Sequence, residues 1–178
     1  MIEGLCGIDE AGRGPFAGPM CIAGVVLKND IEKLNDSKKL SEKKREELFD
    51  IIKENSIYHI VMISNKLIDD MGLSGCLKIA IEEIMENISA KEYLMDGNTT
   101  FGIENLKSLI KADATIKEVS AASILAKVTR DRYMIEVAKK YPEYSFDKHK
   151  GYGTKVHKDA IREHGFCEIH RISYNIKL

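Results

Sequence analysis

The chain has 178 residues, which is enough for one domain with a substantial buried core. Hydrophobic residues make up 44% of it and charged residues 31%, a composition typical of a soluble globular protein. The formal net charge is only −1, from 27 Lys and Arg against 28 Asp and Glu. Any nucleic-acid surface must therefore come from local clustering of basic residues and not from the overall charge.

The four cysteines are Cys6, Cys21, Cys76 and Cys167, and they form no C-x-x-C pair. This spacing indicates reduced thiols and neither a disulfide framework nor a zinc site. The apolar run at residues 20–27 is too short to cross a bilayer. We therefore expect a cytoplasmic protein that does not associate with membranes.

Apolar periodicity and turn residues predict five strands and four helices. The predicted strands are residues 5–10, 20–27, 57–63, 93–96 and 109–113, and the predicted helices are 42–54, 67–88, 119–140 and 155–164. The Gly/Pro-rich connection between the first two strands favours an antiparallel pair. This order predicts an α/β fold in which helices cover the faces of one sheet.

Acidic residues stand at the ends of three predicted strands. They are Asp9 with Glu10, then Asp96, then Asp113. If these strands are neighbours, their carboxylates converge at one edge of the sheet, where a divalent cation would relieve their repulsion. Oxygen ligands without His or Cys select Mg²⁺ or Mn²⁺, and two such ions are suited to phosphodiester hydrolysis.

Each of these acids also has a simpler interpretation, because Asp is common at strand ends and in turns. Adjacent strand residues point to opposite faces, so Asp9 and Glu10 cannot share one inward face. The sequence alone leaves the metal site and the structural role both open.

A second group of residues is suited to contact with a sugar-phosphate backbone. Arg13 between Gly12 and Gly14 can hold a phosphate or can be an ordinary turn residue. Ser37 and Lys38 can contact a phosphate, although loop lysines are usually solvated. Tyr152 between two glycines lacks apolar neighbours, so it is predicted to be exposed and able to stack on a sugar or base. Basic and aromatic residues also alternate over residues 139–158, as on nucleic-acid surfaces or solvated faces.

Other possible catalytic motifs are weak. The histidines show no H-E-x-x-H pattern and are interpreted as structural or phosphate-contacting residues; they are His149, His157, His164 and His170. Ser120 and Ser123 lack the context of a nucleophile elbow and are predicted to be core residues of a helix. The glycines of residues 7–14 do not form a dinucleotide fingerprint, because no helix follows directly.

Six motifs stand in order along the chain, at residues 7–19, 36–40, 95–97, 111–113, 120–131 and 149–157, and residues 170–174 close the pattern. With them the chain resembles prokaryotic type 2 ribonuclease H, the ribonuclease HII family, nearly end to end. The resemblance implies a ribonuclease H-like five-stranded mixed sheet flanked by helices, with a C-terminal helical segment. It implies one domain over residues 1–178, acting as a monomer, whose last ~35 residues form a substrate-binding appendage.

The resemblance also implies an activity. Family members hydrolyse the RNA strand of RNA–DNA hybrids and incise duplex DNA on the 5′ side of single embedded ribonucleotides, leaving a 3′-hydroxyl and a 5′-phosphate. By position, the metal-binding catalytic carboxylates are Asp9, Glu10, Asp96 and Asp113, with Mg²⁺ or Mn²⁺ in a two-metal mechanism. The residues expected to bind substrate are Gly12, Arg13, Gly14, Ser37, Lys38 and Tyr152.

One position departs from the family pattern. Many bacterial relatives have Asn-Ile where this chain has Gly72 and Leu73, so a contact from Asn to the substrate backbone is lost or supplied elsewhere.

Two other classes of protein remain compatible with these residues. One is a duplex-binding protein that has kept the fold and lost the chemistry, although four intact carboxylates argue against it. The other is a different metal-dependent nuclease of the same fold, such as a resolvase.

Overall fold

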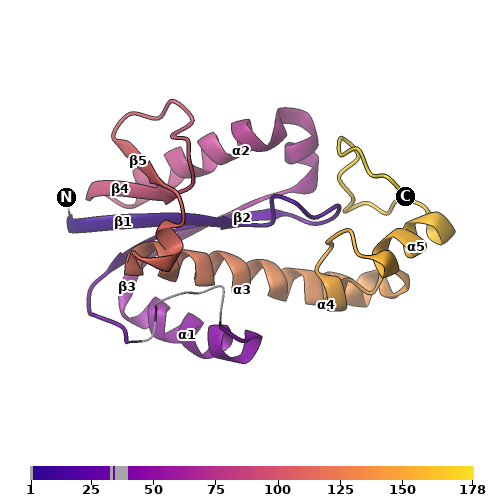
Figure 1. The fold of residues 1–178 in the computed structure, drawn as a ribbon, viewed down its shortest axis with the longest axis horizontal. Coiled ribbons are helices and arrows are strands. Elements are labelled where there is room, and N and C mark those ends of the chain that lie inside the picture. Colours follow the sequence, from indigo (N-terminus) through magenta and orange to yellow (C-terminus); the bar gives the residue numbers. More distant parts are fainter. Residues whose placement is uncertain (1, 33, 35–39) are drawn as a thin grey trace.

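The computed structural model describes residues 2–32, 34 and 40–178 (Figure 1). The predicted substrate-binding residues Ser37 and Lys38 lie outside the described residues. The strands are β1 (Ile2–Ala11), β2 (Met20–Leu27), β3 (Ser56–Ile63), β4 (Ala90–Asp96) and β5 (Leu106–Leu109). The helices are α1 (Glu42–Glu54), α2 (Asn65–Asn87), α3 (Lys117–Lys140), α4 (Phe146–His149) and α5 (Lys155–His164).

The five strands form one mixed sheet in the order β3-β2-β1-β4-β5. β1 pairs with β2, and β2 with β3, in antiparallel register, which confirms the antiparallel pair predicted from the Gly/Pro-rich connection. β4 runs parallel to both β1 and β5. The central strand β1 therefore has an antiparallel neighbour on one side and a parallel neighbour on the other.

Helices cover both faces of the sheet, with α2 on one face and α1 and α3 on the other (Figure 1). Alternation along β2 divides its side chains between the two cores, as expected for a strand buried on both faces. Met20, Ile22 and Val26 pack with α2. Cys21, Ala23 and Val25 pack with α1 and α3.

A glycine allows α3 to lie directly against β1. A Cβ atom at Gly7 would overlap the backbone of Glu118 and Val119 at the start of α3. Only glycine permits this distance between a strand and a helix. The close approach fixes how α3 is rotated over the sheet and so which of its residues face the end of β1.

The predicted fifth strand at residues 109–113 is wrong in position. β5 ends at Leu109, and Lys111 adopts a left-handed conformation with φ 60°. Such a conformation ends an extended strand. Asp113 lies instead in a 3₁₀ turn, Ala112–Ala114, directly before α3.

The long helix α2 is kinked at Gly72. Gly72 has φ 70° and ψ 167° inside the helix, a conformation that glycine adopts without steric cost. The helix begins after Ser64, whose side chain accepts a hydrogen bond from the Leu67 N–H. The predicted helix at residues 67–88 therefore exists but starts earlier, at Asn65.

The C-terminal part of the chain, residues 141–178, packs at the far end of α3 (Figure 1). It forms a third, smaller core with residues of α3 and of the β1–β2 loop. That core is formed by Ala17, Met134, Tyr144, Phe146, Ala160, Ile161 and Ile169. The sequence predicts a loop where the structure has the short helix α4, whereas α5 occupies the predicted residues 155–164. Within the described part of the chain, no helix is both long and apolar enough to cross a membrane.

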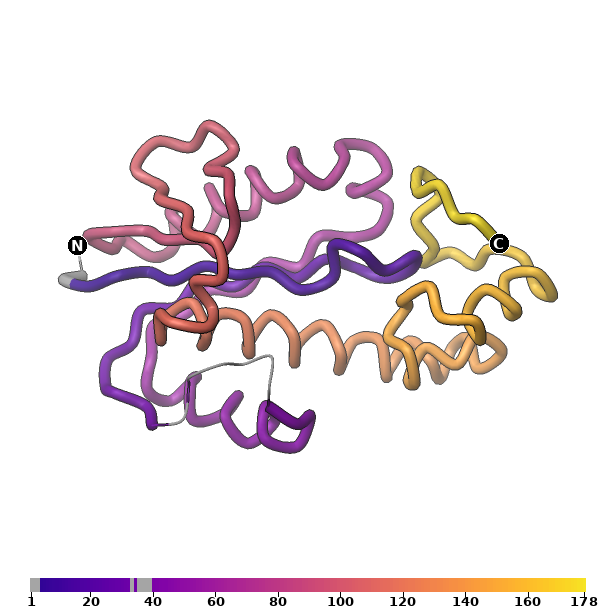
Figure 2. Tube along the Cα trace, viewed as in Figure 1, coloured from indigo at the N-terminus to yellow at the C-terminus, as the bar shows by residue number. Residues whose placement is uncertain are grey.

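Figure 2 shows that the loop between β1 and β2 reaches this C-terminal part. The Phe16 N–H donates to the Gly151 oxygen (2.8 Å), and Ala17 forms an isolated bridge with His170. A loop near the start of the sequence therefore contacts residues near its end.

Candidate active site

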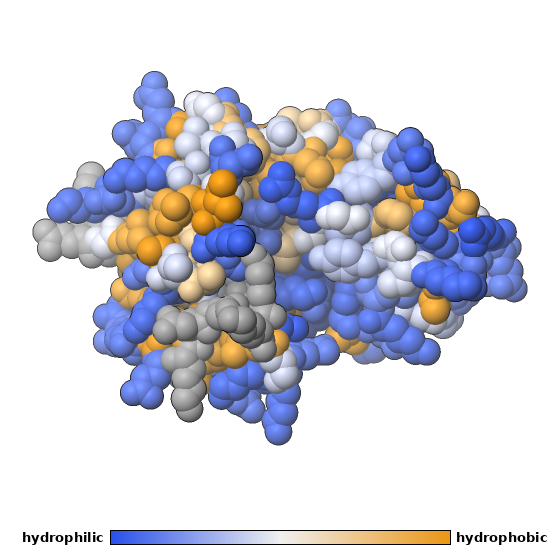
Figure 3. Space-filling view, viewed as in Figure 1, coloured by the Kyte–Doolittle hydropathy of each residue, from blue (hydrophilic) through white to orange (hydrophobic). Residues whose placement is uncertain are grey.

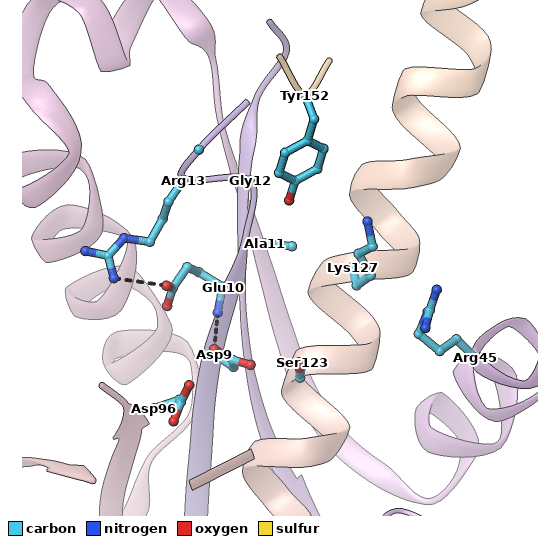
Figure 4. Close-up of a pocket in the computed structure, with 11 residues that line it drawn as sticks. Asp9, Glu10, Ala11, Gly12, Arg13, Arg45, Asp96, Ser123, Lys127 and Tyr152 are labelled. Atoms are coloured by element: carbon cyan, nitrogen blue, oxygen red, sulfur yellow. Dashed lines mark hydrogen bonds and ion pairs between the residues drawn. The ribbon is translucent and has the colours of Figure 1, made fainter. Parts of the chain in front are cut away.

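A pocket opens between the end of β1, the middle of α3 and the C-terminal part (Figure 4). It is lined by Asp9, Glu10, Ala11, Gly12, Arg13, Gly14, Arg45, Asp96, Ser123, Lys127 and Tyr152. In Figure 4 Asp9 and Asp96 lie at one end and Tyr152 lies at the other, with Glu10 and Arg13 paired between them. On the molecular face drawn in Figure 3, a recessed hydrophilic area separates the sheet half from the C-terminal part.

Strand pairing brings Asp9 and Asp96 together. Ile8 of β1 is in register with Met95 of β4, so the next residues along the two parallel strands are these two acids. Side chains at matching positions of parallel neighbours point to the same face. The Asp96 carboxylate is further fixed because its Oδ1 accepts a hydrogen bond from the Ala112 N–H (2.8 Å).

Asp113 joins this pair from the 3₁₀ turn. Carboxylate oxygens of Asp9, Asp96 and Asp113 lie within 4.8 Å of one another, and both Asp9 and Asp113 are buried. The sequence prediction that these acids converge is confirmed for the three aspartates, although Asp113 reaches the site from a turn and not from a strand.

Burial and like charge act strongly on Asp9. They raise the pKa of its carboxyl to about 8, with desolvation as the larger cause and the Glu10 charge as the second. Hydrogen bonds from the Ser123 side chain and from the Glu10 N–H oppose this rise. These hydrogen bonds therefore do not offset the full cost of ionising the Asp9 carboxyl.

Glu10 borders the three aspartates without being one of that group. Its Oε1 pairs with Arg13 Nη1 at 3.2 Å, while its buried Oε2 has no hydrogen-bond partner among the described residues. Burial raises the pKa of Glu10, and the Asp96 charge adds to the rise. The opposite orientation of Asp9 and Glu10, predicted from strand alternation, leaves Glu10 linked to Arg13.

The two glycines beside Arg13 have different surroundings and different structural roles. Gly12 has φ 100°, and a Cβ atom on it would overlap the Arg130 side chain. At Gly14 the described protein leaves open space: apart from Gly14 and its two chain neighbours, no atom lies within 4 Å of the position that a Cβ atom would take. The fold therefore requires Gly12, whereas the small size of Gly14 leaves room beside the pocket for a bound group.

Three polar residues of the pocket were not among the candidate site residues. Ser123 and Lys127 lie one turn apart on the face of α3 toward β1, and Arg45 comes from α1. The prediction that Ser123 is a core residue is wrong, because its side chain is only half-buried and lines the pocket near Asp9. Ser120 is a core residue as predicted, and it donates to the Leu34 oxygen. The spacing of four between Ser123 and Lys127 was the signal that could have placed both on one helix face.

Tyr152 is exposed, as the sequence predicts, with 41% of its surface accessible. Its ring lies 5.8 Å from Lys127 Nζ and 5.7 Å from the Arg130 guanidinium carbon, measured from the ring centroid. Gly153 is required beside it because a Cβ atom there would overlap the Phe16 ring. The tyrosine is therefore presented at the pocket by a tightly packed backbone.

Three histidines form a cluster beneath Tyr152, which confirms the structural interpretation for them. His149 stacks on His157 with ring centroids 4.6 Å apart, and His157 Nε2 lies 3.1 Å from His170 Nε2. Burial lowers the pKa of all three, that of His157 to about 4. They are therefore neutral at pH 7 in the folded protein. The fourth histidine, His164, is exposed.

Solved structures define the class of protein. The structure of the PCNA:RNase HII complex from Archaeoglobus fulgidus matches with a TM-score of 0.82 and 27% identity, covering 98% of this chain and 96% of that one. The crystal structure of ribonuclease H2 from Pyrococcus horikoshii OT3 matches with a TM-score of 0.78 and 28% identity, covering 96% and 93%. The mixed sheet, its helices and the C-terminal part together are the ribonuclease H-like fold of these enzymes.

Sequence comparison identifies the family. The sequence model of ribonuclease HII matches residues 6–177. Ribonuclease HII of Aliarcobacter butzleri is 61% identical over 99% of this chain and 93% of its own, and that of Sulfurovum sp. is 57% identical over 97% and 92%. The chain belongs to the ribonuclease HII family and is a ribonuclease H endonuclease.

We expect the histidine cluster to make stability depend on pH. The unfolded chain binds a proton on His157 near pH 6.5, but the folded protein does so only near pH 4. Unfolding is therefore favoured increasingly as the pH falls from about 7 to about 4, and this contribution levels off below that range. The measurement is the melting temperature of the wild type between pH 7.5 and pH 4.

Two variants isolate the effect from other titrating groups, such as Asp9, whose raised pKa acts in the opposite direction. His157→Gln should flatten the fall in melting temperature, whereas His164→Gln on the same helix should leave it unchanged. Equal pH dependence in both variants would contradict the role of the cluster.

Proposed function

We propose that this protein is a metal-dependent endoribonuclease that hydrolyses the RNA strand of RNA–DNA hybrids. In the same proposal, it incises duplex DNA on the 5′ side of single embedded ribonucleotides and leaves a 3′-hydroxyl and a 5′-phosphate. The observation that carries the proposal is the convergence of Asp9, Asp96 and Asp113 within 4.8 Å, at one end of a pocket that Gly14 and Tyr152 also line. Family membership supports the same activity.

The donor set fits a divalent cation. All the candidate ligands are carboxylate oxygens, the type that Mg²⁺ and Mn²⁺ prefer. The raised pKa of Asp9 and the unpartnered Oε2 of Glu10 indicate that negative charge at the site is not neutralised by the surrounding protein. Asp9, Glu10, Asp96 and Asp113 would hold the metal. When bound, a pair of such ions would activate a water and stabilise the leaving oxygen.

The remainder of the pocket is suited to the nucleic-acid backbone. Arg13, Lys127 and Arg45 line it and bring positive charge to it from three different elements. In the proposal, backbone groups of Gly12 and Gly14, together with Arg13, bind the ribose 2′-hydroxyl and adjacent phosphates. The 2′-hydroxyl distinguishes RNA from DNA, so groups that bind it here would make the enzyme selective for a ribonucleotide.

Tyr152 would pack on the deoxyribose that follows the ribonucleotide. Its exposed ring borders the pocket and is backed by Lys127 and Arg130, which also attract phosphates. A ring in this place would disfavour a second ribose through its 2′-hydroxyl. Ser37 and Lys38 are proposed as further contacts to the nucleic-acid backbone, on the family pattern.

In this proposal, the whole chain is one catalytic domain whose last ~35 residues form an appendage that helps to bind the duplex. The helices of that part contact the β1–β2 loop and α3, so the appendage adds to one pocket and does not form a separate site. We further propose that the enzyme acts as a monomer in the cytoplasm, where its four free thiols would stay reduced.

A cleavage assay on duplex DNA with one ribonucleotide tests the function directly. With Mg²⁺ or Mn²⁺ we expect a single cut on the 5′ side of the ribonucleotide, and EDTA should abolish it. The matched control is the same duplex with deoxyribose at that position, which a 2′-hydroxyl reader leaves intact. Cleavage of both duplexes would indicate a different nuclease of this fold, and cleavage of neither would indicate a protein that only binds.

The Asp96→Asn variant tests the acidic group. Asparagine keeps an oxygen that can accept from the Ala112 N–H, but it removes one ligand charge. We therefore expect cleavage to fall by at least about 100-fold while duplex binding in the absence of metal changes little. Rate and binding are measured on the same single-ribonucleotide duplex. Asp70→Asn, at an exposed position on α2, is the control and should cleave normally.

The Tyr152→Ala variant tests whether Tyr152 recognises the deoxyribose that follows a ribonucleotide. We expect about a tenfold loss of kcat/KM on the single-ribonucleotide duplex but less than about threefold on a long hybrid, since stacking on a base or sugar contributes ~1–3 kcal/mol. Tyr133→Ala, which removes another partly exposed tyrosine from α3 outside this pocket, should affect neither substrate. Equal losses on both substrates would show that Tyr152 does not recognise the step from ribonucleotide to deoxyribonucleotide.

A further inference from the structure

The loop between β1 and β2 lies between two segments of the C-terminal part (Figure 2). On one side, the Phe16 N–H donates to the Gly151 oxygen at 2.8 Å. On the other side, the Arg171 N–H donates to the Phe16 oxygen and the Gly18 N–H donates to the Ile169 oxygen, both at 2.8 Å. The loop that carries Arg13 is therefore held by main-chain hydrogen bonds on both flanks.

Arg171 adds a side-chain anchor to this loop. The residue is fully buried, and its guanidinium donates to three loop carbonyls: Gly12 (2.7 Å), Arg13 (3.0 Å) and Gly18 (3.0 Å). Within the described chain, no carboxylate lies within ion-pair distance of it. Its hydrogen-bonding capacity is thus directed mainly to the backbone of one loop.

Tyr174 completes the anchor. Its hydroxyl donates to the Arg13 oxygen at 2.6 Å and accepts from Arg171 Nη1 at 2.8 Å. The Arg171 guanidinium carbon also lies 5.2 Å from the centroid of the Tyr174 ring. The Arg13 carbonyl therefore accepts two hydrogen bonds from the C-terminal segment.

These contacts determine where the loop N–H groups point. In a trans peptide, the carbonyl of one residue and the N–H of the next point in opposite directions, and the described residues include no cis peptide bond. Because the Gly12 and Arg13 carbonyls point at the C-terminal segment, the N–H groups of Arg13 and Gly14 point away from it. Those residues line the pocket, so the anchor orients the donors that the proposed function assigns to the substrate.

The neighbouring residue His170 anchors the other side of the pocket. The Cys167 N–H donates to His170 Nδ1 at 2.8 Å, so His170 carries its proton on Nε2 and donates it to His157 Nε2 at 3.1 Å. His157 then carries its proton on Nδ1 and donates to the Tyr152 carbonyl at 3.0 Å. Each hydrogen bond in this series has one donor and one acceptor when both rings are neutral.

We infer that His170, Arg171 and Tyr174 form a C-terminal brace that fixes the Gly12–Arg13–Gly14 backbone and Tyr152 relative to each other. None of the three lines the pocket, so they are positioning residues for substrate recognition. This inference rests on the proposed function, because it assigns a role to the groups proposed to bind the ribonucleotide. A loosened loop is in its binding-competent form for a smaller fraction of time, which weakens apparent binding without changing the bound complex.

The Tyr174→Phe variant tests the brace with a minimal change, the loss of one hydroxyl. Its control is Tyr144→Phe, which removes a hydroxyl donating to the Gly165 oxygen (2.8 Å) in the same C-terminal part but away from the loop. Both variants should fold, since each keeps its ring. We expect Tyr174→Phe alone to speed amide hydrogen exchange at residues 12–14.

Kinetics on the single-ribonucleotide duplex supply the second readout. Under single-turnover conditions, Tyr174→Phe should raise the half-saturating enzyme concentration by about three- to tenfold and leave the maximal rate within about twofold. Tyr144→Phe should match the wild type in both, at a similar melting temperature. Arg171→Lys, which keeps the charge but loses the planar fork, should show a larger shift in the same direction.

The outcomes separate the two proposals. If the wild type does not cleave the duplex, the proposed function is wrong, and faster exchange at residues 12–14 still supports the brace as a structural element. If the wild type cleaves and Tyr174→Phe equals Tyr144→Phe in exchange and in half-saturation, the brace is overturned. A loss confined to the maximal rate would also overturn it, because that result would place Tyr174 in the chemical step.

Discussion

The structure depends on keeping the carboxyl groups of three aspartates close together at a largely buried site. Asp9 and Asp96 are neighbours because β1 and β4 pair in parallel register, and Asp113 is added by the turn that begins α3. Their mutual repulsion and burial oppose ionisation, as the raised pKa of Asp9 shows. The hydrophobic cores on both faces of the sheet must therefore be stable enough to hold these carboxylates close together despite that cost.

α3 links this acidic end of the pocket to the end lined by Tyr152. Its first turns pack on β1 at Gly7, its middle presents Ser123 and Lys127, and its last turns carry the small core of the C-terminal part. One rigid helix thus sets the distance between the candidate metal ligands and Tyr152. This explains how residues from both ends of the sequence can form one pocket.

Sequence patterns were sufficient for the parts of the site that depend on local order. Apolar runs ending on Asp9 and Asp96 indicate strand ends, and alternation correctly separates Asp9 from Glu10. The position of Ser123 could not be predicted because it depends on how α3 is rotated over the sheet, which the Gly7 contact decides. The role of Arg171 could not be predicted either, although residues 170–174 belong to the family pattern, because its partners are main-chain carbonyls, which every residue has.

Main-chain groups stabilise both the carboxylates of the pocket and two buried guanidiniums that contact its lining residues. N–H groups of Glu10 and Ala112 donate to the aspartates, whereas carbonyls accept from the buried guanidiniums of Arg130 and Arg171. Burial lowers the pKa of Arg130 to about 10, so it stays charged at neutral pH. Because carbonyls carry only partial charge, they satisfy a guanidinium's hydrogen bonds without cancelling its positive field. In the proposed function, that field would attract a phosphate, while the carboxylates at the opposite end would bind a cation.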